Sequence, residues 1–352
     1  MSKSASENLN ENVALYTKYR PQKFKEVIGQ EHVTDVLEKA ISLGNIAHAY
    51  LFTGSRGIGK TTIARILARE IGTHQDDLYE IDAASNNSID DIRDLNESAN
   101  TLPFNSAYKV YILDEVHMLS KSAFNAFLKT LEEPPKHVIF ILATTELDKI
   151  PDTIISRCES YTIKKPNQKI LKDMILKTAK AEGFTLESSS ADLVALLGDG
   201  SFRDALGILQ KVINSSKDKK LSVEEVEKVT GAPKATLVND FVESILIKDM
   251  EKGMKAVAEA GENNIDMKVY ASLIVTKLRA ILLMRFAKTQ AKRLEDDFSE
   301  EDLKFLEDIA NNKEIKLNSD VLVELLTAYE QIDRSSIPQL PLELALINVI
   351  GE

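Results

Sequence analysis

The stretch GSRGIGKTT, residues 54–62, constrains the fold of this chain more than any other feature. It satisfies the pattern G-x-x-x-x-G-K-[ST], which average residue frequencies produce by chance in a chain of this length about once in a hundred times. A strand-like run, AYLFT, precedes it and a helical run, TIARILAREIG, follows it. Glycines let a loop wrap around phosphate groups, which loop amides and a helix N-terminus stabilise. The pattern therefore predicts a strand, a loop and a helix that bind a nucleoside triphosphate.

The loop residues have expected roles in this site. Lys60 would reach the β and γ phosphates, and the Thr61 hydroxyl would bind Mg²⁺. The alternative is a glycine-rich turn with a solvated lysine. The residues expected to contact the nucleotide are Gly54, Ser55, Arg56, Gly57, Ile58, Gly59, Lys60, Thr61 and Thr62.

A second apolar run, VYILDEVHML at residues 110–119, carries two adjacent carboxylates. In parallel sheets, ligands bind beyond the carboxyl ends of the strands. Asp114 would hold Mg²⁺ through water, and Glu115 would orient and activate the attacking water molecule. The alternative is a strand-end acidic pair in solvent. Because a scaffold that only responds to nucleotide can dispense with Glu115, its presence favours hydrolysis.

The first half of the chain alternates short apolar runs with helical patterns. The runs AYLFTG, LYEID, KVYILDE and HVIFILATT predict buried strands of a parallel sheet covered on both faces. Phe124, Phe127, Leu128 and Leu131 are spaced to lie on one face of a helix that Ser120 can cap. The expected fold class is therefore α/β.

The chain of 352 residues is too long for one core, and its patterns predict three domains. Strand and helix alternate over residues 13–165, until KKPNQ interrupts the pattern. Residues 166–232 read as a small helical domain and residues 233–352 as longer helices. The polar residues 1–12 are expected to be a disordered tail.

Composition limits the class of protein. Hydrophobic residues make up 43% and charged residues 28%, as in ordinary globular proteins. The longest apolar stretch, LRAILLMRFA, contains two arginines, so we expect a packed helix, no membrane association and a cytoplasmic protein. One cysteine excludes an intramolecular disulfide and a multi-cysteine metal site. The net charge of −11 gives no positive evidence for DNA, although local phosphate contacts remain compatible with it.

Two arginines have no role that their local sequence assigns. Arg157, in IISRCESY, has no obvious acidic neighbour. Arg203 lies in the first turn of a helix that Ser201 would cap, with Asp204 at the third position, where the helix dipole disfavours a cation. An approaching anion such as a γ-phosphate would explain Arg203. A surface pair with Asp199 or Asp204 is the alternative.

From residue 13 to its end, the chain resembles the AAA+ clamp-loader ATPases, in particular the gamma/tau subunits of bacterial DNA polymerase III. The segments that carry the resemblance are KYRPQKFKEVIGQEHV, AHAYLFTGSRGIGKTTIARILA, EIDAASNNSIDDIRDL, YKVYILDEVHMLSKSAFNAFLKTLEEPP, FILATTELDKIPDTIISRC and GSFRDALGIL. The resemblance implies an AAA+ P-loop ATPase domain, a small helical lid and an all-α collar that oligomerises. It also implies an ATP hydrolase within a DNA-directed DNA polymerase holoenzyme.

The resemblance assigns further residues to the site. Arg157 would act as an arginine finger on ATP held by a neighbouring subunit; an ion pair within its own domain is the alternative. Thr145 would be sensor 1 and Arg203 sensor 2. Tyr16, Arg20, Val27 and Ile28 would line the adenine pocket, with a buried structural role as the alternative for Tyr16. Cys158 is expected only to pack.

The resemblance also implies partners. These are other clamp-loader subunits in a hetero-oligomer, expected to be pentameric, together with a sliding clamp and primed DNA. Asn86, Asn87 and Arg93, near a helix start capped by Ser88, are candidate DNA contacts. The alternative is a solvated helix, because Asp90, Asp91 and Asp94 would repel a phosphate backbone.

The chain departs from the family in one place. AREIGTHQDDLYEIDAAS joins two motifs that usually flank a four-cysteine zinc module, so no zinc is expected. The extensions of the longer tau form are likewise expected to be absent. Two other functions remain open: another DNA-associated AAA+ ATPase, such as a branch-migration motor or replication-repair remodeller, and a non-hydrolysing subunit that supplies only Arg157.

Overall fold

The computed structural model describes residues 13–291, 298, 300–312 and 317–351, and the predicted disordered tail, residues 1–12, lies outside the described residues. The chain divides into two compact units. The first comprises residues 1–171 and 200–207, and the second comprises residues 172–199 and 208–352. Both α8 (Gln168–Ala181) and α10 (Phe202–Ser215) contain residues of each unit. The three-domain division made from the sequence stays a prediction.

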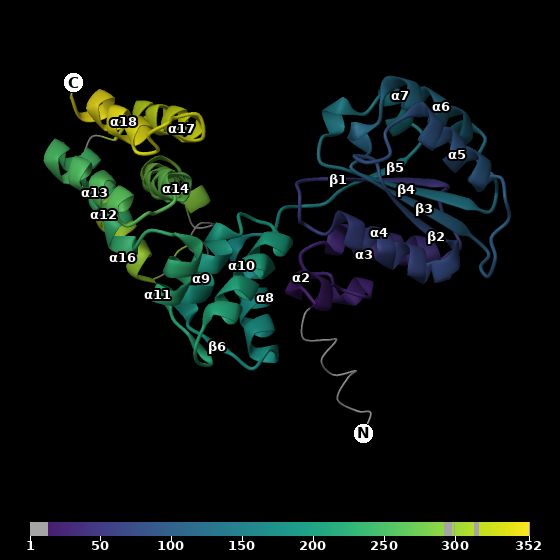
Figure 1. Cartoon of the computed structure of the whole chain (residues 1–352), viewed down its shortest axis with the longest axis horizontal. Helices are drawn as coiled ribbons and strands as arrows, with labels where there is room; N and C mark the ends of the chain where they lie inside the picture. The colour runs from purple at the N-terminus through teal and green to yellow at the C-terminus, as the bar shows by residue number, and fades with distance from the viewer. Residues whose placement is uncertain (1–12, 292–297, 299, 313–316, 352) are drawn as a thin grey trace. The chain divides into compact units, whose positions relative to one another are not determined.

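The first unit is built on a parallel sheet of five strands (Figure 1). In their order across the sheet, the strands are β2 (Leu78–Asp82), β3 (Lys109–Asp114), β4 (Val138–Thr144), β1 (Ala49–Thr53) and β5 (Glu159–Thr162). All four neighbouring pairs are parallel, so the carboxyl ends of the strands share one edge. The predicted parallel sheet is confirmed, and four of its strands coincide with the four apolar runs.

The strand β5 was not predicted, because its sequence, ESYT, has no apolar run. It is an edge strand paired only with β1, with Thr162 opposite Thr53. Glu159, Ser160 and Thr162 are exposed and only Tyr161 is half-buried, so β5 lacks the continuous apolar pattern of the central strands. Arg157 lies two residues before the start of β5.

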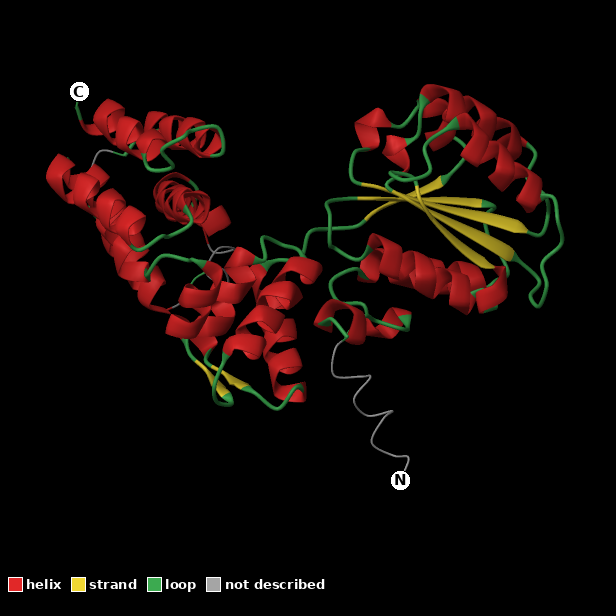
Figure 2. Ribbon diagram, in the orientation of Figure 1, coloured by secondary structure: helices red, strands yellow, loops and turns green. Residues whose placement is uncertain are grey.

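Helices cover both faces of this sheet, as Figure 2 shows. On one face, α3 (Glu31–Ser42) and α4 (Lys60–Glu70) pack against alternate strand residues: Tyr50, Phe52, Val110, Ile112, Ile139 and Ile141. On the other, α5 (Ile89–Ala99), α6 (Lys121–Glu132) and α7 (Asp152–Ile155) pack against the intervening ones: Ala49, Leu51, Tyr111, Leu113, Phe140 and Leu142. Burial of both faces explains why the central strands read as continuous apolar runs. The remaining helical segments of this unit are α2 (Leu15–Lys18), η1 (Phe24–Glu26), η2 (Gln75–Asp77), η3 (Val116–Met118) and η4 (Leu147–Lys149).

Two predicted helix starts are confirmed. Ser120 accepts a hydrogen bond from the backbone amide of Ala123 and caps α6, whose Phe124, Phe127 and Leu131 are buried. Ser88 caps α5 in a reciprocal capping box with Asp91. The Ser88 hydroxyl accepts from the amide of Asp91, and the Asp91 carboxylate accepts from the amide of Ser88. These bonds satisfy amides that a helix leaves unpaired at its first turn.

The second unit is almost entirely helical. Its complete helices are α9 (Ser188–Leu197), α11 (Val223–Thr230), α12 (Ala235–Ile247), α13 (Met250–Glu262), α14 (Met267–Phe286), α15 (Lys288–Ala291), α16 (Glu300–Asn311), α17 (Ser319–Ile332) and α18 (Leu340–Ile350). Two short parallel strands, β6 (Thr185–Leu186) and β7 (Lys220–Leu221), were not predicted. The central helix α14 contains the longest apolar stretch and is buried through Tyr270, Ile274 and Ile281, as expected of a packed helix. Among the described residues, no helix is long and apolar enough to cross a membrane.

We expect Ser88→Ala to weaken the first turn of α5 by about 1 kcal/mol, because the alanine cannot accept the amide hydrogen bond of Asp91. Ser88→Asp, which retains a capping oxygen, is the matched control. Hydrogen exchange of the α5 amides measures the change locally. Equal exchange rates in the wild-type chain and Ser88→Ala would show that the cap contributes nothing.

Candidate functional site

The loop between β1 and α4 has a backbone that only glycine adopts easily. Gly54, Gly57 and Gly59 have φ angles of 140°, 75° and 107°. At Gly57 a side chain meets a second obstacle, because a Cβ atom there would overlap Oγ of Ser201. The loop therefore approaches the start of α10 closely, and the backbone amide of Arg203 donates a hydrogen bond to the carbonyl of Gly57 (3.4 Å).

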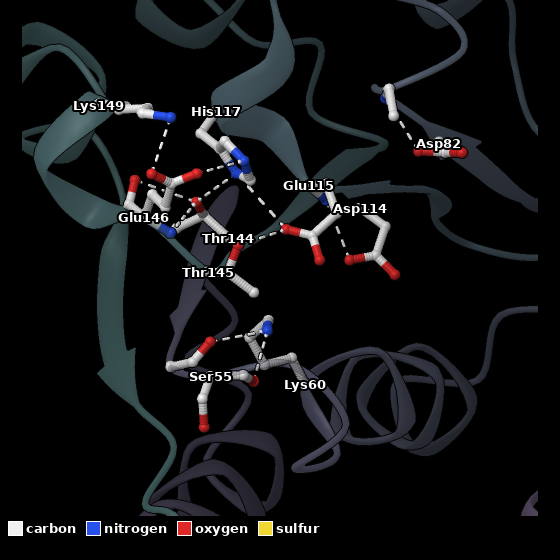
Figure 3. A network of polar contacts seen from close by, with 12 residues as sticks. Ser55, Lys60, Asp82, Asp114, Glu115, His117, Thr144, Thr145, Glu146 and Lys149 are labelled. Carbon is white, nitrogen blue, oxygen red and sulfur yellow. Dashed lines mark hydrogen bonds and ion pairs between the residues drawn. The ribbon is translucent and has the colours of Figure 1, made fainter. Parts of the chain in front are cut away.

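The ammonium group of Lys60 is buried beneath this loop. Its side chain belongs to the first residue of α4 and is only 5% exposed. Nζ donates to the carbonyl oxygens of Gly54 (2.8 Å) and Ser55 (2.9 Å), as seen in Figure 3. Burial lowers the pKa of Lys60, and the carboxylates of Glu115 and Asp114 oppose this effect. A buried cation held by neutral carbonyls is well placed to bind an anion such as a phosphate.

A hydroxyl and a carboxylate meet where α4 begins and β3 ends. Thr61 Oγ1 donates a hydrogen bond of 2.6 Å to Oδ2 of Asp114. Hydroxyl and carboxylate oxygens are the ligands that Mg²⁺ prefers, so this pair fits the ion. Within the described ranges, no group of three or more His, Cys, Asp or Glu side chains could hold a metal. Thr61 and Asp114 are the residues that would hold a magnesium ion here, Asp114 through water.

The second carboxylate, Glu115, lies on a left-handed residue with a φ of 48°. Such a conformation is uncommon for a residue other than glycine and is often found at functional sites. The backbone amide of Glu115 donates to Oδ1 of Asp114 (3.0 Å), and the Thr145 hydroxyl donates to Oε2 of Glu115 (3.0 Å). The structure therefore brings Glu115 and Thr145 together at the carboxyl ends of β3 and β4.

Sequence reasoning missed three residues beside this pair: His117, Thr144 and Glu146. The His117 ring is 7% exposed and lies between the side chains of Thr144 and Glu146 (Figure 3). A polar residue in the apolar run VYILDEVHML was the available signal. That signal does not identify the partners of His117, because Thr144 and Glu146 lie at the end of β4, whereas His117 follows β3.

Arg203 and Tyr16 lie together near the loop. The Arg203 guanidinium is 5.9 Å from the centre of the Tyr16 ring, a cation–π distance. Ser201 caps α10 by accepting from the amide of Asp204, as predicted. Arg203 also adds to the lowering of the Lys60 pKa, so its positive charge acts on the phosphate-binding position. Tyr16 is 39% exposed, which excludes the buried role considered as its alternative.

The remaining residues predicted to contact the nucleotide differ in how far their side chains are buried. Ile58 is 2% exposed and packs in the core, so only its backbone is available to a ligand. Val27 is partly buried against the same core, whereas Ile28 is 40% exposed. The carbonyl of Arg20 accepts from the side chain of Gln22. The assignment of these residues to an adenine pocket stays a prediction.

Arg157 lies near the amino ends of the parallel strands, whereas Lys60 lies near their carboxyl ends. Arg157 precedes the amino end of β5, whereas the loop follows the carboxyl end of the neighbouring parallel strand β1. Arg157 and the loop are therefore separated by the length of these two strands. The Arg157 guanidinium donates to Oε1 of Glu132 (2.5 Å) and to the carbonyl of Thr153 (2.6 Å). The expectation that Arg157 lacks an acidic neighbour was wrong, since the guanidinium pairs with Glu132. The local sequence does not show this pair, because Glu132 lies 25 residues before Arg157.

The neighbouring thiol has simple surroundings. Burial raises the pKa of Cys158 to about 12, and its side chain packs against the core as expected.

The candidate DNA contacts bond to their own domain. Asn86 donates to the carbonyl of Asp82, and the Asn87 carbonyl accepts from the backbone amide of Ser120. Arg93 pairs with Asp90 (2.9 Å) on the exposed side of α5. These contacts leave the role of the segment in DNA binding as a prediction.

Three family models match parts of the chain. Residues 221–352 match domain III of the DNA polymerase III subunits gamma and tau, and residues 71–167 match the DNA polymerase III delta subunit. Residues 23–111 match subunit ChlI of magnesium chelatase.

Curated relatives cover most of the chain. The DNA polymerase III subunit tau of Bacillus subtilis is 39% identical over 78% of this chain and 52% of that protein. Subunit tau of Escherichia coli is 38% identical over 78% and 45%, and subunit gamma/tau of Mycobacterium tuberculosis is 34% identical over 80% and 53%. The chain thus spans about half the length of the curated relatives it matches.

A solved structure shares the fold. Thermotoga maritima RuvB, a Holliday junction branch migration motor, superposes with a TM-score of 0.53 at 22% identity, covering 73% of this chain and 91% of that one. This likeness shows the fold and no more. It agrees with the five-stranded parallel sheet and its flanking helices.

We expect Gly57→Ala to weaken ATP binding at least about tenfold. The added Cβ would place alanine in a left-handed conformation costing about 1–2 kcal/mol and would also displace Ser201. Gly207→Ala in α10, where a Cβ meets no atom within 4 Å, is the matched control and should bind ATP normally. Isothermal titration calorimetry of both variants checks this, and equal affinity for the two would contradict the role of the loop.

Proposed function

This chain is a relative of the gamma and tau subunits of DNA polymerase III, and from that premise we propose that it is the ATPase subunit of a clamp loader. It would bind and hydrolyse ATP at subunit interfaces and thereby load a sliding clamp onto primed DNA. One observation supports this proposal. Lys60, Thr61 and Asp114 lie together at the carboxyl ends of the strands, whereas Arg157 lies near the amino ends and pairs with Glu132.

The residues at the carboxyl edge support hydrolysis of the γ-phosphate. Lys60 would bind the β and γ phosphates, and Glu115 would accept a proton from water while the water oxygen attacks phosphorus. The bond to the bridging oxygen would break, giving ADP and inorganic phosphate. Magnesium held by Thr61 and Asp114 would supply positive charge beside the phosphate oxygens. Thr145 lies within reach of Glu115 and would sense the phosphate.

Arg157 would complete the site of the adjoining subunit. Its present partner, Glu132, is 52% exposed, and pairs of this kind contribute about 0–1 kcal/mol. The guanidinium can therefore leave Glu132 at little cost when a phosphate of another subunit approaches. An arginine finger contributes about 10³ to 10⁵ in rate, so the exchange is favourable for catalysis.

The partners of the chain follow from the same proposal. We assign it to a hetero-oligomer, pentameric by family resemblance, that forms through residues 233–352 and acts on a sliding clamp and primed DNA. The candidate DNA contacts are Asn86, Asn87 and Arg93 at the start of α5. Because its bacterial relatives are subunits of a DNA polymerase, we place the complex in the cytoplasm with the chromosome.

Mixing two inactive variants tests the shared site. We expect Arg157→Ala to bind ATP normally but to abolish turnover in the assembly with partner subunits, clamp and primed DNA. Lys60→Ala should fail to bind ATP. Mixed assemblies should recover part of the turnover, because Lys60 of one variant and Arg157 of the other form an intact site. A coupled phosphate-release assay measures each rate.

Arg65→Ala is the matched control, since Arg65 also forms a partly exposed ion pair, with Glu80, in the same unit. It should hydrolyse ATP at close to the wild-type rate. If mixed assemblies of verified composition remain inactive, or if Arg157→Ala hydrolyses ATP as fast as Arg65→Ala, the shared-site proposal is refuted.

A further inference from the structure

His117 is a buried polar residue that the proposed hydrolysis does not use. It lies in η3, two residues after Glu115, and its ring is 7% exposed. Nδ1 is 3.1 Å from Oγ1 of Thr144 and 3.5 Å from Oε2 of Glu115. Nε2 is 3.1 Å from Oε1 of Glu146. Both ring nitrogens therefore have defined partners (Figure 3).

The far side of the ring is fixed by an ion pair. Oε2 of Glu146 accepts from Nζ of Lys149 (2.8 Å), and this hydrogen bond lowers the pKa of Glu146. An ionised carboxylate only accepts hydrogen bonds, so Nε2 of His117 must carry the proton between them. Thr144 is fully buried at the end of β4, and its hydroxyl is further held by the backbone of Glu146. The imidazole thus has a fixed orientation, with Nε2–H directed at Glu146.

The near side of the ring faces the carboxylate that would activate water. Oε2 of Glu115 accepts from Thr145 at 3.0 Å and has Nδ1 of His117 at 3.5 Å. The ring attracts this carboxylate when Nδ1 as well as Nε2 carries a proton, because a carboxylate oxygen only accepts hydrogen bonds. The left-handed backbone of Glu115 directs this side chain towards the end of β4, where Thr144 and Thr145 lie. A carboxylate that must take a proton from water needs a defined rotamer, because misplacement forfeits much of the rate.

We propose that His117 is a positioning residue for Glu115, held in place by Thr144 and by the Glu146–Lys149 ion pair. The inference rests on the proposed ATP hydrolysis, in which Glu115 acts on water. The side-chain contacts described for His117 are with Thr144, Glu115 and Glu146, and not with Thr61 or Asp114, the expected magnesium ligands. The effect of His117 is therefore on turnover and not on ATP binding.

Three variants of the full chain in its assembly test this role. His117→Phe keeps the ring volume but removes both nitrogens, and should lower kcat about tenfold, a fraction of the 10² to 10⁴ that a general base contributes. KM for ATP should stay within about twofold. His117→Asn restores a polar group near the Nδ1 position and should recover most of the loss. His137→Phe, which removes a ring nitrogen bonded to the carbonyls of Ala99 and Thr101, is the matched control and should leave kcat unchanged.

A double-mutant cycle tests the far side of the ring. Glu146→Gln removes the charge that fixes Nε2 and should lower kcat about threefold in the wild-type background. In the His117→Phe background it should cause no further loss, because the contact is already absent. Independent, multiplicative losses would show that Glu146 does not act through His117 and would overturn that part of the inference.

A measurement without turnover separates this inference from the proposed function. In ¹⁵N spectra of the histidine-labelled full chain, His117→Phe identifies the His117 signals. Glu115→Gln and Glu146→Gln should each shift them while leaving those of His137 unchanged. Signals that neither substitution moves, or a His117→Phe enzyme with wild-type kcat, would overturn the positioning role. Absence of hydrolysis by the wild-type assembly would instead refute the proposed function, and the spectra would still decide the contact.

Discussion

The buried ammonium of Lys60 is the constraint on which the site depends. The parallel sheet places its loop beside the carboxyl end of β3, so a cation and the carboxylates of Asp114 and Glu115 share one edge. Lys60 Nζ donates to the backbone carbonyls of Gly54 and Ser55, which bear no net charge. Burial of a charge is costly unless an anion or strong hydrogen bonds compensate it. In the proposed function, the phosphate groups of ATP would be this anion, bound by the loop amides, Lys60 and the start of α4.

The same sheet separates the two cations that catalysis would need. Lys60 lies after the carboxyl end of β1, and Arg157 lies before the amino end of β5, which is its parallel neighbour. One domain therefore cannot bring both to one phosphate. In the proposed assembly, the Lys60 of one subunit and the Arg157 of the next would meet at one phosphate. Glu132 holds the arginine in the isolated chain through a weak, partly exposed ion pair that assembly can replace.

Local patterns predicted much of this structure, and tertiary contacts account for what they missed. The glycine-rich loop, the four apolar strands and the caps at Ser88 and Ser120 depend on neighbours within a few residues, so the sequence shows them directly. The strand β5 is short and polar, and its pairing depends on β1. The partners of Arg157 and His117 come from other elements, 25 and 29 residues away at Glu132 and Glu146. The placement of Tyr16 beside Arg203 likewise needs the fold.

A structure of the assembled complex with a non-hydrolysable ATP analogue tests the divided site most directly. The account predicts that the Arg157 guanidinium lies within hydrogen-bonding distance of the γ-phosphate bound to Lys60 of an adjoining subunit, and that its bond to Glu132 is broken. A closed interface in which Arg157 still pairs with Glu132 in every subunit, far from any γ-phosphate, would contradict it.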